Sequence, residues 1–140
     1  MAETLAAAAA SGTSVTISAG RTGIVGGAVP PGGTLLSLAD MKRVLGVRQL
    51  TDGRLAVRVE PGISVAEFRE ALPGILSEHA PDAGNHFYPP DPTEDTAHLG
   101  ATVATNASGA RSYRYGATRR HVHGLRVTLT TGDVVAPSRG

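Results

Sequence analysis

The sequence predicts one α+β domain, and three observations lead to this class. Its 140 residues are enough for one domain and too few for two ordinary ones, and no repeat or linker divides them. A capped helix signal begins at Ser64. Short β-prone runs surround that helix, at residues 14–18, 34–38, 47–50, 55–59 and 125–135.

The first half of the chain begins with an alanine-rich stretch. Residues 3–11 predict an exposed helix that Gly12 ends, because alanine has the highest helix propensity. The first two strands are separated by a glycine-rich loop, residues 19–33, and residues 40–45 could form one or two helical turns. The Asp52-Gly53 turn signal then joins the strands at 47–50 and 55–59 into a hairpin, with Leu55, Val57 and Val59 on one face.

The second half is centred on the helix that Ser64 caps. Glu67 completes a capping box, and Val65, Phe68 and Leu72 recur at helical spacing. We expect this helix to end before Pro73. Residues 77–96 are predicted to be irregular, and residues 99–116 hold small residues without a long apolar run. Leu125–Val135 predicts a final hairpin around the turn at residues 131–133.

Composition excludes several classes of protein. Hydrophobic residues make up 41% and charged residues 18%, a globular balance, and the net charge of +1 does not indicate a polyanion-binding protein. No cysteine is present, so the sequence offers neither a disulfide scaffold nor a thiolate metal site. The N-terminal stretch lacks a basic region and is too short and weakly apolar to span a bilayer. We therefore expect a cytoplasmic protein without a membrane span.

The glycine-rich loop is the first candidate site. Its glycines at 20, 23, 26 and 27 match neither a GxGxxG fingerprint nor a P-loop, and Pro30 and Pro31 argue against a following helix. Successive backbone amides in such a turn can nevertheless converge on an anion, and glycine would provide positive φ and close approach to the ligand. The other interpretation is a plain surface loop.

Five sequence blocks, in order, resemble one family. They are AGRTGIVGGAVP, LLSLADMKRVL, VRVEPGISVAEF, YPPDPTEDTAHLGATVATNASG and YGATRRHVHGLRVTLTTGD. Together they resemble the FAD-binding domain of the p-cresol methylhydroxylase and vanillyl-alcohol oxidase type. The chain is most similar to the branch with the glycolate oxidase D-subunit, D-lactate dehydrogenase and alkyl-dihydroxyacetone-phosphate synthase. The resemblance covers residues 15–135 and implies two α+β subdomains with FAD between them.

The resemblance also implies a set of cofactor-binding residues. The backbone of residues 20–23 would wrap the FAD pyrophosphate, the turn at residues 91–93 would lie along the cofactor, and the small residues at 100–101 and 105–109 would line the isoalloxazine and ribityl region. The full set is Ala19, Gly20, Arg21, Thr22, Gly23, Ile24, Gly26, Gly27, Asp91, Pro92, Thr93, Gly100, Ala101, Thr105, Asn106, Ala107, Ser108 and Gly109. The glycine loop contains no histidine, so noncovalent FAD is expected.

Departures from the family pattern mark this chain. The family commonly has glycine where Arg21 and Ala101 stand, and aspartate where Arg120 stands. The family also has a further strand and helix before residue 1, and after the final hairpin it continues into a glycine-rich segment and a separate substrate domain. The resemblance therefore implies that residues 1–140 are a partial FAD-binding domain of an oxidase or dehydrogenase of a 2-hydroxy acid or similar alcohol. That enzyme would also need a C-terminal domain or partner subunit. A non-catalytic fragment that holds FAD weakly is the other hypothesis, and we expect residues 1–140 alone to be inactive.

Other side chains suggest further sites. His121 and His123 have a ligand-compatible spacing on one face of an expected strand, but no third metal ligand is evident. His98 precedes the expected flavin-lining glycine and is a candidate to approach the ring. Tyr113 and Tyr115 are expected to pack rather than to catalyse. The arginines at 111, 114, 119 and 120 form a solvated face or face another domain, and without an aromatic platform they do not predict nucleic-acid binding.

Overall fold

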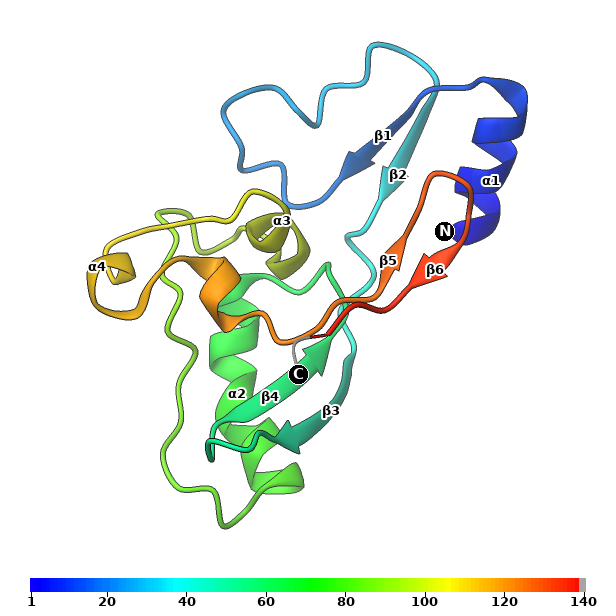
Figure 1. Ribbon diagram of the computed structural model, residues 1–140. Helices are drawn as coiled ribbons and strands as arrows, with labels where there is room; N and C mark the ends of the chain where they lie inside the picture. Colours follow the sequence, from blue (N-terminus) through cyan, green and yellow to red (C-terminus); the bar gives the residue numbers. More distant parts are fainter. Residues whose placement is uncertain (139–140) are drawn as a thin grey trace.

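The strands of this chain form small two-stranded sheets rather than one large sheet (Figure 1). The computed structural model describes residues 1–138, and three such sheets lie within them. In the first, β1 (Val15–Ser18) pairs in parallel with β2 (Thr34–Ser37). The antiparallel pairs are β3 (Val44–Gln49) with β4 (Leu55–Val59), and β5 (Val127–Thr128) with β6 (Val134–Val135). The predicted α+β class and both predicted hairpins are confirmed.

The glycine-rich loop connects two parallel strands without a helix. Helix α1 (Ala2–Ser11) ends at Gly12, whose φ of 67° gives the left-handed cap, as the sequence predicts. The chain then enters β1, leaves it through residues 19–33 and returns in β2 with Val15 opposite Thr34. Figure 1 shows this loop extending to one side of the strand pair, above the region of α3 (Leu99–Ala104).

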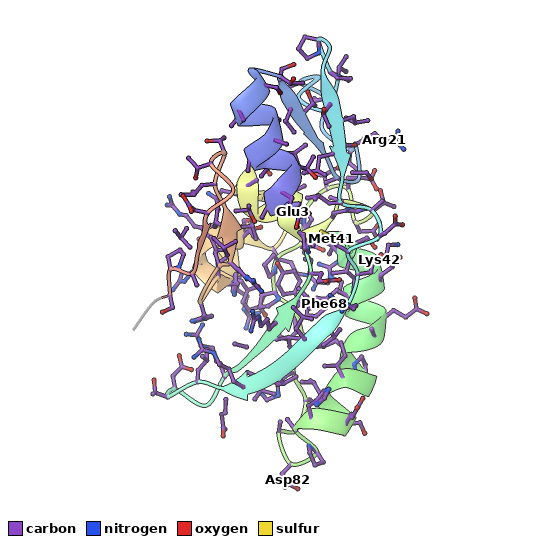
Figure 2. The ribbon with its side chains drawn as sticks, turned by 90° about the vertical axis from the view of Figure 1, so that its right-hand side faces the viewer. Glu3, Arg21, Met41, Lys42, Phe68 and Asp82 are labelled. Carbon is purple, nitrogen blue, oxygen red and sulfur yellow. The ribbon has the colours of Figure 1, made fainter. Side chains whose placement is uncertain are left out.

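The core lies between α2 (Val65–His79) and the β3–β4 hairpin. The apolar face of the helix buries the predicted residues Val65, Phe68 and Leu72, and Val57 and Val59 of β4 pack against them. Figure 2 shows Phe68 between the helix and the strands, and its ring meets Tyr88 edge to face with 5.3 Å between centroids. Ile75 and Leu76 extend the same buried face by one more turn.

Two predictions about element bounds are wrong. Helix α2 passes through Pro73, whose side chain is exposed, because the turn beyond it buries Ile75 and Leu76. Burial of two such side chains contributes about 3–6 kcal/mol, enough to offset the cost of about 3 kcal/mol for a helical proline. Residues 40–45 form no helical turn, because Val44 begins β3 opposite Val59.

The chain after α2 contains short helices that the sequence does not predict. Residues 80–98 are irregular, apart from isolated bridge positions, and α3, α4 (Ser112–Tyr115) and the 3-10 helix η1 (Thr118–His121) follow. Each spans no more than six residues and lacks an apolar run that sequence periodicity could detect. No helix within residues 1–138 has the length and apolar character that a membrane crossing requires.

The capping box of α2 ties this helix to the strand connection at residue 42. Ser64 Oγ accepts the Glu67 amide, the Glu67 carboxylate accepts the Ser64 amide, and Lys42 Nζ donates to Glu67 Oε1 at 2.6 Å. These donors, Lys42 first and the Ser64 amide second, lower the pKa of Glu67 to about 2. The ionised carboxylate therefore stabilises the folded chain.

Glu67 should make stability depend on pH in the acid range. A lowered pKa gives stability that is complete above the ordinary value of 4.5 and is lost as the pH falls toward about 2. Glu67→Gln keeps a capping-box acceptor but removes the charge, so its urea midpoint should fall slightly at neutral pH and vary less with acid than the wild-type midpoint. Glu70→Gln, on the same helix, is the control. Parallel acid profiles for wild type and Glu67→Gln would contradict the assignment.

Candidate functional site

The glycine loop rests on the segment that precedes α3. A Cβ built on Gly20 would lie 3.0 Å from the Thr96 carbonyl oxygen and 3.1 Å from His98 Cδ2. Only a residue without a side chain fits this approach without displacing a neighbour. Gly20 is therefore the point at which the loop and the chain before α3 meet.

Fewer glycines of this loop have positive φ than the sequence predicts. Gly26 has φ 72°, and Gly32 and Gly33 are also left-handed, but Gly20, Gly23 and Gly27 are not. Arg21, which stands where the family commonly has glycine, has φ 56°. That conformation costs a non-glycine residue about 1–2 kcal/mol. Figure 2 shows Arg21 projecting outward from the loop.

The outer part of the loop is open to solvent. Gly23 and Gly27 have no neighbouring atom within 4 Å of a built Cβ, and Ile24 is 100% exposed. Within residues 1–138, the backbone amides of residues 20–24 donate no hydrogen bond to another group of the chain. Successive amides without internal partners are the donors that an anion-binding nest requires.

A second part of the site joins the 91–93 turn to the 105–109 run. Pro92 and Gly109 form an isolated antiparallel bridge, and a Cβ on Gly109 would overlap the Asp91 carbonyl oxygen. The chain itself therefore fills the space beside Gly109. Gly100 is similar, because a Cβ there would overlap Pro61. At these two glycines, packing within the chain explains the missing side chain, and close approach of a ligand is not needed to explain it.

Two arginines hold the 91–93 turn, and the sequence gives no signal for this role. Arg69 Nη2 donates to Asp91 Oδ1 and to the Pro90 carbonyl, each at 2.6 Å. Arg111 Nε lies 3.6 Å from Asp91 Oδ2. The Asp91 side chain is about three-quarters buried, so these ion pairs are partly shielded from solvent. The Asp91 carboxylate thus faces the protein and fixes the position of its turn.

Side-chain and backbone hydrogen bonds hold the 105–109 run against η1. Asn106, with φ 50°, accepts the Arg119 amide at 2.9 Å through Oδ1. The fully buried Thr118 donates to the Ala107 carbonyl through both its amide and its hydroxyl. These bonds fix residues 106–107 in one position. Beside them opens a pocket of 350 Å³ lined by Asn106, Gly116, Ala117, Arg119 and Arg120.

The structure brings together only some of the predicted site residues. Gly20 meets the chain before Gly100, and Asp91 and Pro92 meet Gly109. The outer loop residues from Gly23 to Gly27 extend away without contacting either group. A second pocket, of 190 Å³, lies between β3 and the chain after α2, away from all of these residues.

Histidine and tyrosine positions differ from two sequence expectations. His121 lies in η1 rather than in a strand, and its Nε2 is 3.0 Å from the Tyr115 carbonyl oxygen. Burial lowers the pKa of His121. Among residues 1–138, no three His, Cys, Asp or Glu side chains are placed to hold a metal ion. Tyr113 is fully exposed, against the packing expectation, whereas the Tyr115 ring packs against Phe87 at 5.5 Å.

Comparison with known proteins decides the family. The model of the family described as "FAD binding domain" matches residues 1–137. The chain belongs to this FAD-binding domain family. It is 40% identical over 124 residues to a D-lactate dehydrogenase of Anaerostipes hadrus, which covers 86% of this chain and 23% of that protein. Glycolate oxidase subunit GlcD of Bacillus subtilis (strain 168) is 30% identical, with 81% of this chain and 22% of the relative covered.

A further relative and a solved structure complete the comparison. The D-2-hydroxyglutarate dehydrogenase of Stutzerimonas stutzeri (strain A1501) is 32% identical over 84% of this chain and 23% of its own length. The crystal structure of 6-hydroxy-D-nicotine oxidase from Arthrobacter nicotinovorans superposes with a TM-score of 0.73 at 20% identity, covering 98% of this chain and 27% of that one. At that identity the likeness shows the fold alone. The FAD-binding domain described here spans about a quarter of the length of these proteins.

The residues of the glycine loop fit FAD. The diphosphate of FAD needs several donors, and the loop offers successive amides without partners inside the chain. The His98 ring approaches Gly20 through Cδ2, and its buried Nδ1 has no hydrogen-bond partner. Several amides without partners inside the chain are the donors that a nest for the FAD diphosphate would use.

Substitution of Gly109 should test the packing of the second part of the site. Gly109→Ala places a methyl group on the Asp91 carbonyl, so the free energy of unfolding should fall by about 1–3 kcal/mol. Gly27→Ala is the matched control, because its Cβ meets open space at an ordinary φ. That change should leave stability unchanged or raise it by less than about 1 kcal/mol. Urea unfolding followed by circular dichroism measures both, and equal midpoints would contradict the close approach.

Proposed function

We propose that the full-length protein is an FAD-dependent dehydrogenase or oxidase of a 2-hydroxy acid, and that residues 1–140 supply part of its FAD-binding domain. The observation that carries this proposal is the glycine loop with its unpartnered amides in a chain of the FAD-binding family. The names of three relatives support the substrate class, because lactate, glycolate and 2-hydroxyglutarate are all 2-hydroxy acids.

In this proposal the loop after β1 binds the FAD diphosphate noncovalently. The amides of residues 20–23 donate to its oxygens, and the hydroxyl of Thr22 adds a donor. Arg21 contributes a positive charge, which compensates for the absence of the glycine that the family commonly has there. The strained φ of Arg21 supports a functional reason for an arginine at this position.

The remaining proposed residues line the flavin and the sugar chain of FAD. They are Asp91, Pro92, Thr93, Gly100, Ala101, Thr105, Asn106, Ala107, Ser108 and Gly109. Arg69 and Arg111 act behind them by fixing the Asp91 turn against Gly109. When bound, FAD supplies a hydride acceptor at N5, while the protein supplies orientation and electrostatics.

We place the selection of substrate outside residues 1–140, in a further domain or a partner subunit. The share of each relative that this chain matches, about a quarter, supports that division. Within the described part of the chain, the residues that line the pocket beside Arg119 and Arg120 include no carboxylate or histidine that could accept a hydroxyl proton from a substrate. A cytoplasmic location also belongs to this proposal.

Purification of the full-length protein tests the proposed function. It should be yellow, release its flavin on denaturation, and lose its flavin colour anaerobically with D-lactate, glycolate or D-2-hydroxyglutarate. Added FAD should stabilise the apoprotein by about 2.7 kcal/mol at a hundredfold excess over Kd. Colourless protein without this stabilisation would refute FAD binding. Yellow protein that none of the acids reduces would favour a non-catalytic FAD-binding role.

Gly23 offers a test of the loop that leaves the fold alone. Because its surroundings are open and its φ is ordinary, Gly23→Val should change the free energy of unfolding by less than about 0.5 kcal/mol. FAD affinity, measured by flavin fluorescence quenching, should fall at least about tenfold as the side chain enters the diphosphate position. Gly74→Ala, on the exposed face of α2, is the control. Wild-type affinity in Gly23→Val would show that the loop is a surface turn.

A further inference from the structure

His98 is a buried histidine without a partner at its ring nitrogen Nδ1. The residue is only 9% exposed, and it lies directly before α3. Arg69 Nε is the other buried side-chain nitrogen without a partner within residues 1–138, but the Arg69 guanidinium already donates twice through Nη2. Within the described residues, His98 Nδ1 is therefore the buried side-chain atom whose missing hydrogen-bond partner most needs an explanation.

The backbone around His98 fixes where its ring points. His98 is paired with Ser64 in an antiparallel bridge, the Val65 amide donates to the Ala97 carbonyl at 3.0 Å, and the Leu99 amide donates to the Ile63 carbonyl at 2.8 Å. On its other side, the ring places Cδ2 3.1 Å from the position of a Cβ on Gly20. Cδ2 is the ring atom that approaches Gly20, and Nε2 is bonded directly to it.

The orphaned Nδ1 selects one tautomer of this ring. A buried N–H without an acceptor is costlier than a buried lone pair without a donor. The tautomer with its proton on Nε2 avoids that cost, because Nδ1 is then only an acceptor. This tautomer carries its proton on the nitrogen bonded to Cδ2, the ring atom that approaches Gly20.

We propose that His98 Nε2–H donates a hydrogen bond to the diphosphate of bound FAD. The inference rests on the proposed function, in which the loop amides of residues 20–23 hold the same group. A diphosphate oxygen beside these amides is an anionic acceptor, to which the Nε2–H group can donate. His98 thereby becomes a cofactor-binding residue of this chain, added to the set that the glycine loop provides.

Nuclear magnetic resonance of protein labelled with 15N at histidine tests the tautomer. In a neutral imidazole, the nitrogen that carries the proton and the one that does not have well-separated 15N shifts. His98, assigned by the disappearance of its signals in His98→Gln, should carry its proton on Nε2 in the apoprotein. Its Nε2 signal should shift when FAD is added. A proton on Nδ1, or an Nε2 signal unmoved by saturating FAD, would overturn the proposal.

Substitutions separate a ligand contact from a structural role. His98→Leu removes the donor together with the orphaned acceptor, so the thermal midpoint of the apoprotein should stay equal or rise. Affinities for FAD and for ADP, which shares the diphosphate, should both fall about tenfold, whereas riboflavin, which lacks phosphate, should bind unchanged. His98→Gln, with an amide N–H near the Nε2 position, should keep most of the affinity. His79→Leu, on the exposed end of α2, is the control.

The outcomes separate the role of His98 from the proposed FAD-dependent function. Wild-type protein that binds FAD while His98→Leu binds FAD and ADP equally well overturns the role of His98 and leaves the proposed function intact. A lower thermal midpoint in His98→Leu with unchanged affinities likewise assigns His98 to the fold and overturns the inference. Wild-type protein that binds neither FAD nor ADP overturns both. If His98→Leu does not fold, the His98→Gln affinities and the 15N shifts decide.

Discussion

The pairing of residues 61–65 with residues 97–100 is the interaction on which the rest of this structure depends. Amides of Val65, Leu99 and Gly100 donate across it to the carbonyls of Ala97, Ile63 and Pro61. On one side of this pairing, α2 and the β3–β4 hairpin bury most of the apolar core. On the other side lie the glycine loop and the small-residue run. Because these backbone bonds form inside the protein, the core fixes the candidate site even though the site itself buries little apolar surface.

Close packing of backbone on backbone is the second constraint. Gly100 lies against Pro61, and Gly109 lies against the Asp91 carbonyl, so neither position accepts a side chain. The arginine pair on Asp91 acts in the same direction, since it holds a proline-rich turn that has no regular hydrogen bonding of its own. A partly buried carboxylate between two guanidinium groups fixes position more than it adds stability. Rigid placement of this kind is what a flat, extended cofactor requires of its binding surface.

Flavin chemistry makes modest demands on the residues of this domain. The cofactor accepts the electrons, so the protein has to bind, orient and neutralise it. In the proposed function, these demands fall to the unpartnered amides after β1, the charge of Arg21 and the ring of His98. Of these groups, Arg21 stands where the family commonly has glycine.

The sequence by itself determined the α+β class, the two hairpins, the start of α2 and the family, because capping, turn signals and motif order are local and short in range. It placed the end of α2 wrongly at Pro73, since the burial of Ile75 and Leu76 that offsets the helical proline depends on contacts with another element. The sequence did not predict the six-residue and four-residue helices after residue 98, because they are too short to carry a periodic signal. Only the tertiary structure decided why Gly100 and Gly109 are glycines and which group the Asp91 carboxylate faces. It also decided that Cδ2 of His98 lies beside Gly20. Each of these features depends on contacts between segments that are distant in sequence. Local sequence patterns do not predict such contacts.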